Sequence, residues 1–283
     1  MKIRKDDELG IRMKSYEHMT IPERFIPFLP IIIRVDGRSF SGFTRGLKEP
    51  FDENFSDCMI ETTKALVEEA NALMGYTQSD EISLLLYEDN IKSQLYFGGR
   101  VFKTISSLAS TATYVFNNSL LPKYLPEKVG KWARFDCRAF NVPTKDEAVN
   151  EFLWRELDAT RNSIEGAARS VYSHKDCFLK NCSMLQEMLF QKGVNWNDYP
   201  DRFKRGTYIQ KRLVEKPFTE EEIEYFPEKH NARKNPDLVI KRHVISVIQM
   251  PPILKVVNRV GVFFNGEEPV VLEEKTENNR GVL

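Results

Sequence analysis

Two acidic clusters in the first third of the chain have the residue types that bind a metal ion together with a nucleotide. Asp36-Gly37 directly follows the apolar run Pro30–Val35, and Asp80-Glu81 directly precedes a second apolar run. A strand that ends in Asp-Gly places a carboxylate beside an unhindered backbone at the edge of a sheet. Carboxylate oxygens are the ligands that Mg²⁺ prefers, and Mg²⁺ also binds nucleotide phosphates. Each cluster alone is ordinary turn chemistry, but the pair, followed by a basic helix, indicates a metal-dependent nucleotide site.

The elements around these clusters must bring the two carboxylates together. The run Pro30–Val35 predicts a buried central strand. Asp52 predicts the N-cap of a helix, and Gly75 stands where the C′ glycine of that helix belongs. A hairpin over Tyr76–Tyr87 follows, with Asp80 in or beside its turn. This β-α-β-β order places both carboxylates at neighbouring strand ends.

The rest of the chain predicts a second helix, a fourth strand and a mainly helical second half. The first half then reads β-α-β-β-α-β, an open antiparallel sheet backed by two helices on one face. The predicted ranges are a helix over Ser93–Phe116, a strand over Trp132–Phe140, helices within Asp146–Gln191, a strand over Arg205–Ile209, an exposed excursion over Glu215–Pro236, and closing strands over Val239–Ile248 and Val256–Phe264 with a hairpin at Asn265-Gly266. We predict two domains, a catalytic domain over residues 1–136 and an extension of helices and strands over residues 137–283.

Bulk properties limit where a nucleic acid could bind. The 283 residues include 41 Lys and Arg and 41 Asp and Glu, so the net charge is zero and a nucleic-acid site must be a local basic patch. The candidate cations are Arg202, Lys204, Arg205, Lys211 and Arg212. No stretch approaches the ~20 apolar residues that span a bilayer, and the first residues contain no apolar signal core. Four scattered cysteines fit a reducing compartment, so we expect a cytoplasmic protein.

Further residues have the chemistry to bind phosphate. Arg100 and Lys103 lie one helical turn apart and share a face, from which both could reach triphosphate oxygens. Ser39, Phe40 and Ser41 follow Gly37 and could offer backbone N–H groups to phosphates.

Four segments together resemble the tRNA-histidine guanylyltransferase family. They are Arg34–Phe40, Thr77–Glu81, Arg100–Lys103 and Lys204–Thr207, and the likeness covers roughly residues 14–212. The resemblance implies an α+β fold with an RRM-like palm, similar to that of 5′–3′ polymerases and nucleotide cyclases but run in the opposite direction. It also implies an enzyme that adds nucleotides from GTP or ATP to the 5′ end of tRNA, and assembly into a homotetramer, a dimer of dimers.

The resemblance assigns roles to individual residues. Asp36 and Asp80 would bridge two Mg²⁺ ions, the Gly37 carbonyl would be a further ligand, and Glu81 would be a second acid beside the site. The incoming nucleotide would contact Asp36, Gly37, Arg38, Ser39, Phe40, Ser41, Ser79 and Asp80, with Arg100 and Lys103 on its triphosphate. Asn162 and the candidate cations of the second half would contact tRNA.

One departure from the family pattern bears on the reaction. Eukaryotic members carry a His-Ile-Asn-Asn segment that the family associates with guanylate addition to tRNA-histidine. Here Thr160 stands where the histidine would be, and Asn162 remains. This looks like the guanylyltransferase-like branch of bacteria, archaea and phages, which implies template-dependent repair of truncated tRNA 5′ ends.

Three alternatives stay open at this point. The first is guanylate addition to tRNA-histidine. The second is a nucleotide cyclase on the same palm, which would need no RNA surface. The third is a non-enzymatic RNA-binding protein, which would present sheet aromatics in a motif that Val35–Arg38 does not match.

Overall fold

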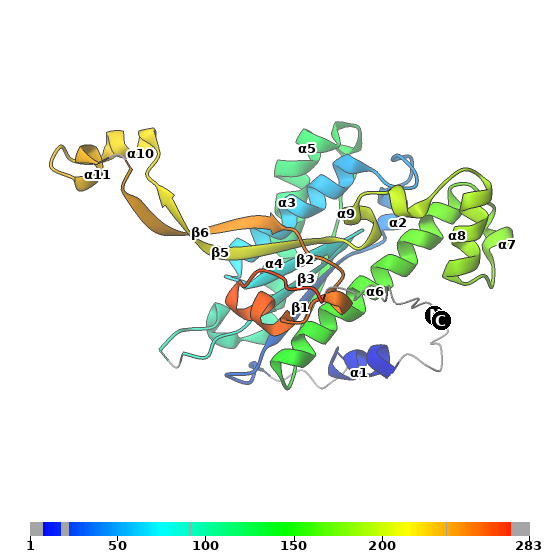
Figure 1. Cartoon of the computed structure of the whole chain (residues 1–283), viewed down its shortest axis with the longest axis horizontal. Coiled ribbons are helices and arrows are strands. Elements are labelled where there is room, and N and C mark those ends of the chain that lie inside the picture. The colour runs from blue at the N-terminus through cyan, green and yellow to red at the C-terminus, as the bar shows by residue number, and fades with distance from the viewer. Residues whose placement is uncertain (1–7, 18–22, 91, 236, 273–283) are drawn as a thin grey trace, which may run out of the picture.

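A single antiparallel sheet organises the molecule in the computed structural model, which describes residues 8–17, 23–90, 92–235 and 237–272 (Figure 1). Its six strands lie in the order β4-β1-β3-β2-β5-β6. Their bounds are β1 (Ile31–Gly37), β2 (Met74–Gln78), β3 (Glu81–Leu86), β4 (Phe135–Asn141), β5 (Thr207–Pro217) and β6 (Val239–Ile248). The first four strands and their two long helices follow the predicted β-α-β-β-α-β order, so the α+β prediction is confirmed.

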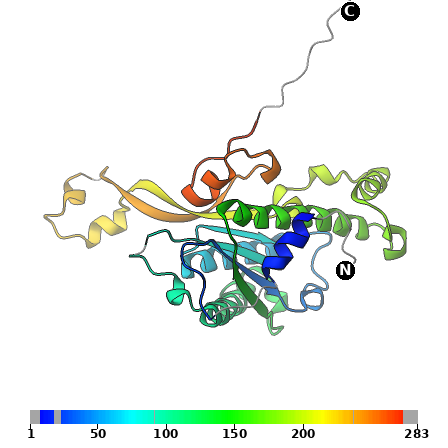
Figure 2. The same ribbon diagram turned by 90° about the horizontal axis from the view of Figure 1, so that it is seen from below.

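Helices cover both faces of this sheet (Figure 2). The helices α3 (Glu53–Glu69) and α4 (Val101–Tyr114) pack on one face, and α6 (Lys145–Arg169) packs on the other. Successive strand residues point to opposite faces, so Ile31 and Ile33 face α3 and α4 while Ile32 faces α6. Because β1 is buried on both faces, its sequence is a continuous apolar run.

Shorter helices complete the described chain. They are α1 (Glu8–Glu17), α2 (Phe40–Phe43), α5 (Leu121–Tyr124), α7 (His174–Cys177), α8 (Cys182–Gln191), α9 (Asp201–Lys204), α10 (Glu220–Tyr225) and α11 (Asn231–Lys234). Single 3-10 turns cover Tyr96–Gly99, Pro126–Lys128, Trp196–Asp198 and Ile253–Lys255, and π-helical turns cover Val115–Leu120 and Gly261–Asn265. Among the described residues, no helix combines the length and apolar character that crossing a bilayer requires.

The helix α3 begins as predicted but ends earlier. The Asp52 side chain accepts a hydrogen bond from the Phe55 N–H at 2.9 Å, which confirms the N-cap. The left-handed residue after the helix is Asn71, with φ 52°, so the prediction of Gly75 as the C′ residue is wrong. Gly75 lies in β2, where a Cβ atom would come within 2.6 Å of Val67 Cγ2 on α3. Glycine therefore serves the close approach of helix and sheet at this position.

Two predicted elements differ from the structure. The helix expected over Ser93–Phe116 begins only at Val101, because the preceding Phe97 and Gly98 have φ of 51° and 62°. The strand expected over Val256–Phe264 is absent among the described residues, and Gly266 ends a π-helical turn instead of forming a hairpin. Phe263 packs on Phe152 of α6 with ring centroids 5.0 Å apart, so the run is buried against a helix, and periodicity alone does not distinguish helix from strand for such a short apolar run.

The second half adds two strands to the sheet of the first half. β5 pairs with β2, with Gly75 opposite Ile209, and β6 pairs with β5. The proposed domain boundary at residue 136 falls within β4. β5 runs past its predicted end, and β5 and β6 leave the body as a two-stranded ribbon that carries α10 and α11 at its tip (Figure 1). The segment predicted as an exposed excursion thus contains the end of β5 together with α10 and α11, and residue 236 lies outside the described residues.

Candidate active site

Backbone pairing at one end of the sheet holds the two aspartates together. In the β1–β3 ladder Asp36 lies opposite Glu81. β2 and β3 are joined by the two-residue turn Ser79-Asp80, in which Ser79 has φ 53°. The Gly37 N–H donates a hydrogen bond to the Asp80 carbonyl at 2.9 Å. The predicted placement of Asp36 and Asp80 at neighbouring strand ends is confirmed.

Gly37 is required by this close approach. A Cβ atom on it would lie 2.8 Å from the Asp80 Cβ and 2.5 Å from a ring carbon of Phe40. Phe40 is 3% exposed, and its ring packs 5.1 Å from that of Phe135. The Phe40 side chain therefore belongs to the core and supports the site from below, so any contact of Phe40 with a nucleotide would have to come from its backbone.

Burial and neighbouring carboxylates disfavour the ionisation of both aspartates. Burial and then the neighbouring Glu81 raise the pKa of Asp36. Burial and then Asp36 raise the pKa of Asp80 to about 6. Like charges this close are costly without a cation. The pair is therefore electrostatically prepared for a positively charged ligand.

Glu81 lies at the site with its carboxylate already paired. Arg155 of α6 donates to both of its oxygens, from Nε at 2.6 Å and from Nη2 at 2.9 Å. Arg34 donates to it from Nη2 at 2.9 Å, and also pairs with Glu17. Burial opposes ionisation of Glu81, but the two arginines outweigh it and its pKa is lowered. Glu81 thus holds position beside the aspartates instead of offering free oxygens to a metal.

A cavity of about 660 Å³ opens over the aspartates. Asp36, Ser41, Ser79 and Asp80 line it, together with the loop Thr44–Asp52 and residues of α6 and α9. Gly37, Arg38 and Ser39 are not among the described residues that line it.

The loop contributes two exposed cations, Arg45 and Lys48, to the cavity wall. Its course is fixed by Lys128, which is 4% exposed and donates from Nζ to the Arg45 carbonyl at 2.7 Å. Our sequence interpretation missed both cations, although a Gly-containing basic loop between a metal-site strand and the next helix is a signal for phosphate binding. It also missed Arg155.

Arg100 and Lys103 lie elsewhere. Arg100 is the N-cap residue of α4, and the next residue, Val101, donates from its N–H to the Glu23 carbonyl at 3.1 Å, near the start of β1. The other end of α4 reaches the site, where Thr113 accepts a hydrogen bond from the Phe135 N–H. A 14-residue helix is about 20 Å long. Neither Arg100 nor Lys103 is among the described residues that line the cavity, so we do not expect them to contact a triphosphate held there.

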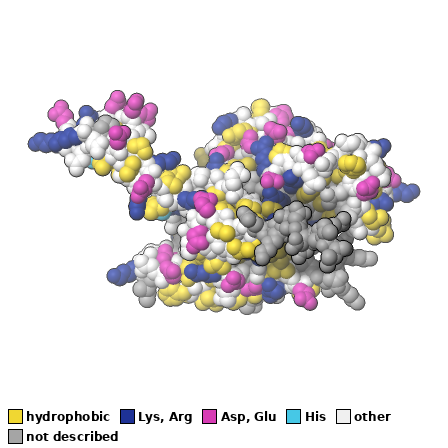
Figure 3. Space-filling model, viewed as in Figure 1, with side chains coloured by type: hydrophobic (Ala, Val, Ile, Leu, Met, Phe, Trp, Pro, Cys, Tyr) yellow, Lys and Arg dark blue, Asp and Glu magenta, His cyan; other side chains and the backbone are white. Residues whose placement is uncertain are grey.

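Of the residues predicted to bind tRNA, Asn162 and Arg202 line the cavity. Lys204 and Arg205 both pair with Asp201, at 3.3 and 2.6 Å. The other two are also paired, Lys211 with the Asn71 side chain and Arg212 with Glu268. On the face in Figure 3, acidic and basic side chains are interspersed. Most of the predicted basic cluster is therefore held in pairs within the chain.

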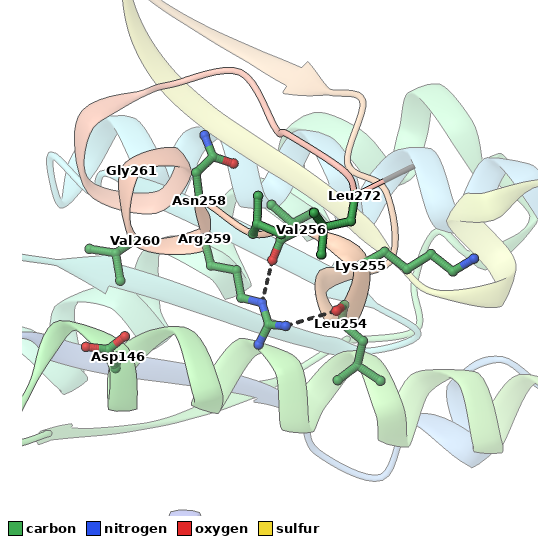
Figure 4. A pocket seen from close by; sticks show the side chains of 10 residues that line it. Asp146, Leu254, Lys255, Val256, Asn258, Arg259, Val260, Gly261 and Leu272 are labelled. Carbon is green, nitrogen blue, oxygen red and sulfur yellow. Dashed lines mark hydrogen bonds between the residues drawn. The ribbon is translucent and has the colours of Figure 1, made fainter. Parts of the chain in front are cut away.

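A second cavity, of about 610 Å³, lies between α6 and the segment Leu254–Gly261 (Figure 4). Arg259 spans its wall and donates to the carbonyls of Val256 and Leu254 at 2.7 and 2.9 Å. None of the predicted site residues lines it. Asp36 and Asp80 thus line the first of these two cavities and not the second.

Comparisons with known proteins identify the family of this chain. The family model described as tRNAHis guanylyltransferase, Thg1, matches residues 10–143. A bacterial Thg1-like protein solved in complex with ATP is 38% identical, with 72% of this chain and 87% of that chain covered and a TM-score of 0.63. The chain belongs to the Thg1 family. A bacterial Thg1-like protein solved with GTP is similar to this Thg1-family protein at 32% identity, with 88% and 95% covered and a TM-score of 0.64.

Curated relatives extend this likeness to other organisms. Protein R259 of Acanthamoeba polyphaga mimivirus is 30% identical over 74% of this chain and 79% of its own. The tRNA(His) guanylyltransferase of Neurospora crassa is 27% identical over 75% and 77%. The Thg1-family protein is a nucleotidyltransferase, which removes the cyclase and the non-enzymatic RNA-binding alternatives.

Proposed function

We propose that this Thg1-family protein is a template-dependent 3′–5′ nucleotidyltransferase that restores missing nucleotides at the 5′ end of tRNA, with GTP and ATP as substrates. The observation that carries the proposal is the pair Asp36 and Asp80 at adjacent strand ends, opening on a cavity with a cationic loop. The cavity volume lies within the range of about 300–1,000 Å³ that suits ligands of nucleotide size.

The donor set fits Mg²⁺. No group of three or more His, Cys, Asp or Glu side chains among the described residues could hold a metal ion, so Asp36 and Asp80 would act with the Gly37 carbonyl, water and phosphate oxygens. Mg²⁺ keeps several such ligands and needs few carboxylates. Two bound Mg²⁺ ions would lower the pKa of the attacking hydroxyl and neutralise charge on the reacting phosphates.

The remaining residues position the substrate. Arg45 and Lys48 are placed to bind phosphate oxygens of a triphosphate that lies over the aspartates, since both are exposed to the same cavity. The Glu81–Arg155 pair keeps a third carboxylate from turning toward the metal ligands. Asn162 and Arg202 offer polar contacts on the α6 and α9 side of the cavity, where we place the end of the RNA.

Thr160 supports repair over guanylate addition to tRNA-histidine. A threonine has no imidazole to offer at this position, and the Thr160 hydroxyl is already used, because it donates a hydrogen bond to the Glu156 carbonyl at 2.9 Å. Pairing against the 3′ side of the acceptor stem would then supply selectivity, and the protein needs to read only tRNA shape and backbone. Guanylate addition stays the second candidate, because the matched family model carries that name.

The deciding experiment compares kcat/KM for a tRNA lacking its first 5′ nucleotide with kcat/KM for full-length tRNA-histidine, using radiolabelled GTP. We expect a clear preference for the truncated tRNA and no incorporation by Asp36→Ala, because this variant lacks a metal ligand. A preference for full-length tRNA-histidine would leave guanylate addition as the function. The expected homotetramer is tested separately by light scattering of the purified protein, which would give four times the 32.9 kDa chain mass.

A further inference from the structure

Two phenylalanine rings form a parallel stack in the wall of the same cavity. Phe51, just before α3, and Phe203 of α9 have ring centroids 5.0 Å apart and ring planes within 4° of parallel. Both residues line the cavity that contains Asp36 and Asp80. Segments about 150 residues apart in the sequence thus place two flat apolar surfaces beside a polar metal site.

The surrounding side chains hold this stack in place. The Arg202 guanidinium lies 4.8 Å from the centre of the Phe203 ring, and is itself paired with Asp57 at 2.9 Å and Glu53 at 3.4 Å. Tyr199 meets the Phe51 ring edge-on, with ring centroids 5.1 Å apart. A platform that is rigid before binding loses less conformational freedom when a ligand arrives.

Core packing does not account for the two rings. Both are only half-buried, and neither Phe51 nor Phe203 belongs to the apolar core clusters of the described residues. The exposed parts of both rings face a cavity lined by polar and apolar residues, and covering this apolar surface with a flat apolar ligand is favourable in water. Aromatic rings and Arg guanidinium planes are the surfaces on which nucleobases stack.

We propose that Phe51, Phe203 and Arg202 form a stacking subsite for one nucleobase of the substrates. This subsite rests on the proposed function, since it assumes nucleotide and RNA substrates. Stacking accepts every base because each base has a π-face. Such a subsite would bind a nucleotide without selecting its identity, as a reaction whose selectivity comes from base pairing requires. The base comes either from the incoming nucleoside triphosphate or from the 5′ terminus of the RNA.

The test separates base contacts from phosphate contacts in the full-length protein with Mg²⁺. Phe203→Leu keeps an apolar side chain but removes the π-face, and Phe203→Tyr is the matched control that retains the ring. The first pair of ligands is ATP and inorganic tripolyphosphate, which carries the phosphates without a base. The second pair is a 5′-truncated tRNA and the same tRNA with an abasic 5′ nucleotide. Dissociation constants for all four ligands are measured by calorimetry or fluorescence.

We expect Phe203→Leu to raise the dissociation constant of one base-carrying ligand about five-fold or more. The base-free partner of that ligand should bind to the variant as it does to wild type. A loss of affinity for ATP assigns the subsite to the incoming nucleotide, and a loss of affinity for the truncated tRNA assigns it to the RNA terminus. Phe203→Tyr should bind as wild type does. Equal weakening of both members of each pair, or no weakening of either, would show that the stack only docks α9 on α3 and would overturn the proposal.

The outcome is distinguishable from failure of the proposed function. Base-dependent binding of ATP together with a preference for full-length tRNA-histidine would keep the subsite and reject repair. Repair activity without base-dependent binding would keep the function and reject the subsite. Phe51→Leu provides an independent second variant if Phe203→Leu lowers the melting temperature.

Discussion

Burial of the Asp80 carboxyl beside Asp36 predicts that Asp80→Asn makes the metal-free protein more stable while abolishing nucleotide addition. Asparagine has nearly the same size but no charge. The rise in the Asp80 pKa from 3.8 to about 6 corresponds to a destabilisation of about 3 kcal/mol at neutral pH, since one pKa unit equals about 1.4 kcal/mol. Because Asp80 is partly exposed and solvent screens the charges, we expect a gain of about 1–3 kcal/mol.

The pH dependence of this gain has a definite sign. Asp80 is more basic in the folded state than in the unfolded state, so between pH 4 and pH 6 the unfolded state releases the proton first. The stability of the wild type then falls relative to Asp80→Asn as the pH rises through this window, and the difference stays constant above it. Below pH 4 the two proteins should be equally stable in this respect.

Urea denaturation in EDTA at pH 4, 5, 6 and 7.5 measures this difference. Asp136→Asn is the matched control, because Asp136 lies opposite Asp36 in the β1–β4 ladder but its side chain is 56% exposed. Addition of Mg²⁺ should then stabilise the wild type and not Asp80→Asn, because only the wild type retains the ligand pair. If Asp80→Asn is no more stable in EDTA at pH 7.5, or if Mg²⁺ stabilises both proteins equally, our account of the site is refuted.

Three further predictions concern the surroundings of the aspartates. Arg155→Met should destabilise the protein by less than the roughly 3–5 kcal/mol of a fully broken buried pair, because Arg34 still holds Glu81. Urea denaturation measures this loss of stability, and adding Glu81→Gln should recover part of it. Arg45→Ala should raise the KM for nucleoside triphosphate about ten-fold or more by removing a charge-assisted phosphate contact, whereas Arg100→Ala should leave this KM unchanged in the same steady-state assay. Burial raises the pKa of the Glu151 carboxyl to about 8, so its contribution to stability declines as the pH rises from about 5 to 8, and Glu151→Gln should flatten the stability profile measured across that window.

Local pattern was enough to predict the centre of the fold. The run Pro30–Val35 is apolar because β1 is covered on both faces, and Asp52 caps a helix by a contact made within four residues. The placement of Asp36 and Asp80 followed from strand order alone. Asp80 lies in the hairpin turn from which β3 begins, and β3 pairs antiparallel with β1, so the turn lies beside the end of β1 that carries Asp36. These features depend on neighbours in the sequence or on one simple topology.

The features that sequence reasoning missed depend on contacts between distant segments. The apolar run around Phe263 forms a π-helical turn because it packs on α6, more than a hundred residues earlier. The direction of α4 carries Arg100 away from the cavity, and helical spacing in the sequence does not reveal where a helix begins in space. Arg45 reaches the cavity because Lys128, distant in the sequence, anchors its carbonyl.

The hydrogen bond between the Gly37 N–H and the Asp80 carbonyl also bears on how such enzymes can diverge. It fixes the separation of the two carboxylates through the register of β1 and β3, so a single insertion in the Ser79-Asp80 turn would shift one strand and point its side chains to the other face. The loop Thr44–Asp52 lies outside the strands, and the outer part of the β5–β6 ribbon pairs with no other strand, so a length change in either would not shift β1 against β3. Length changes in evolution should therefore accumulate in the loop and the ribbon, altering which RNA is bound, while the turn that carries Asp80 keeps its two residues.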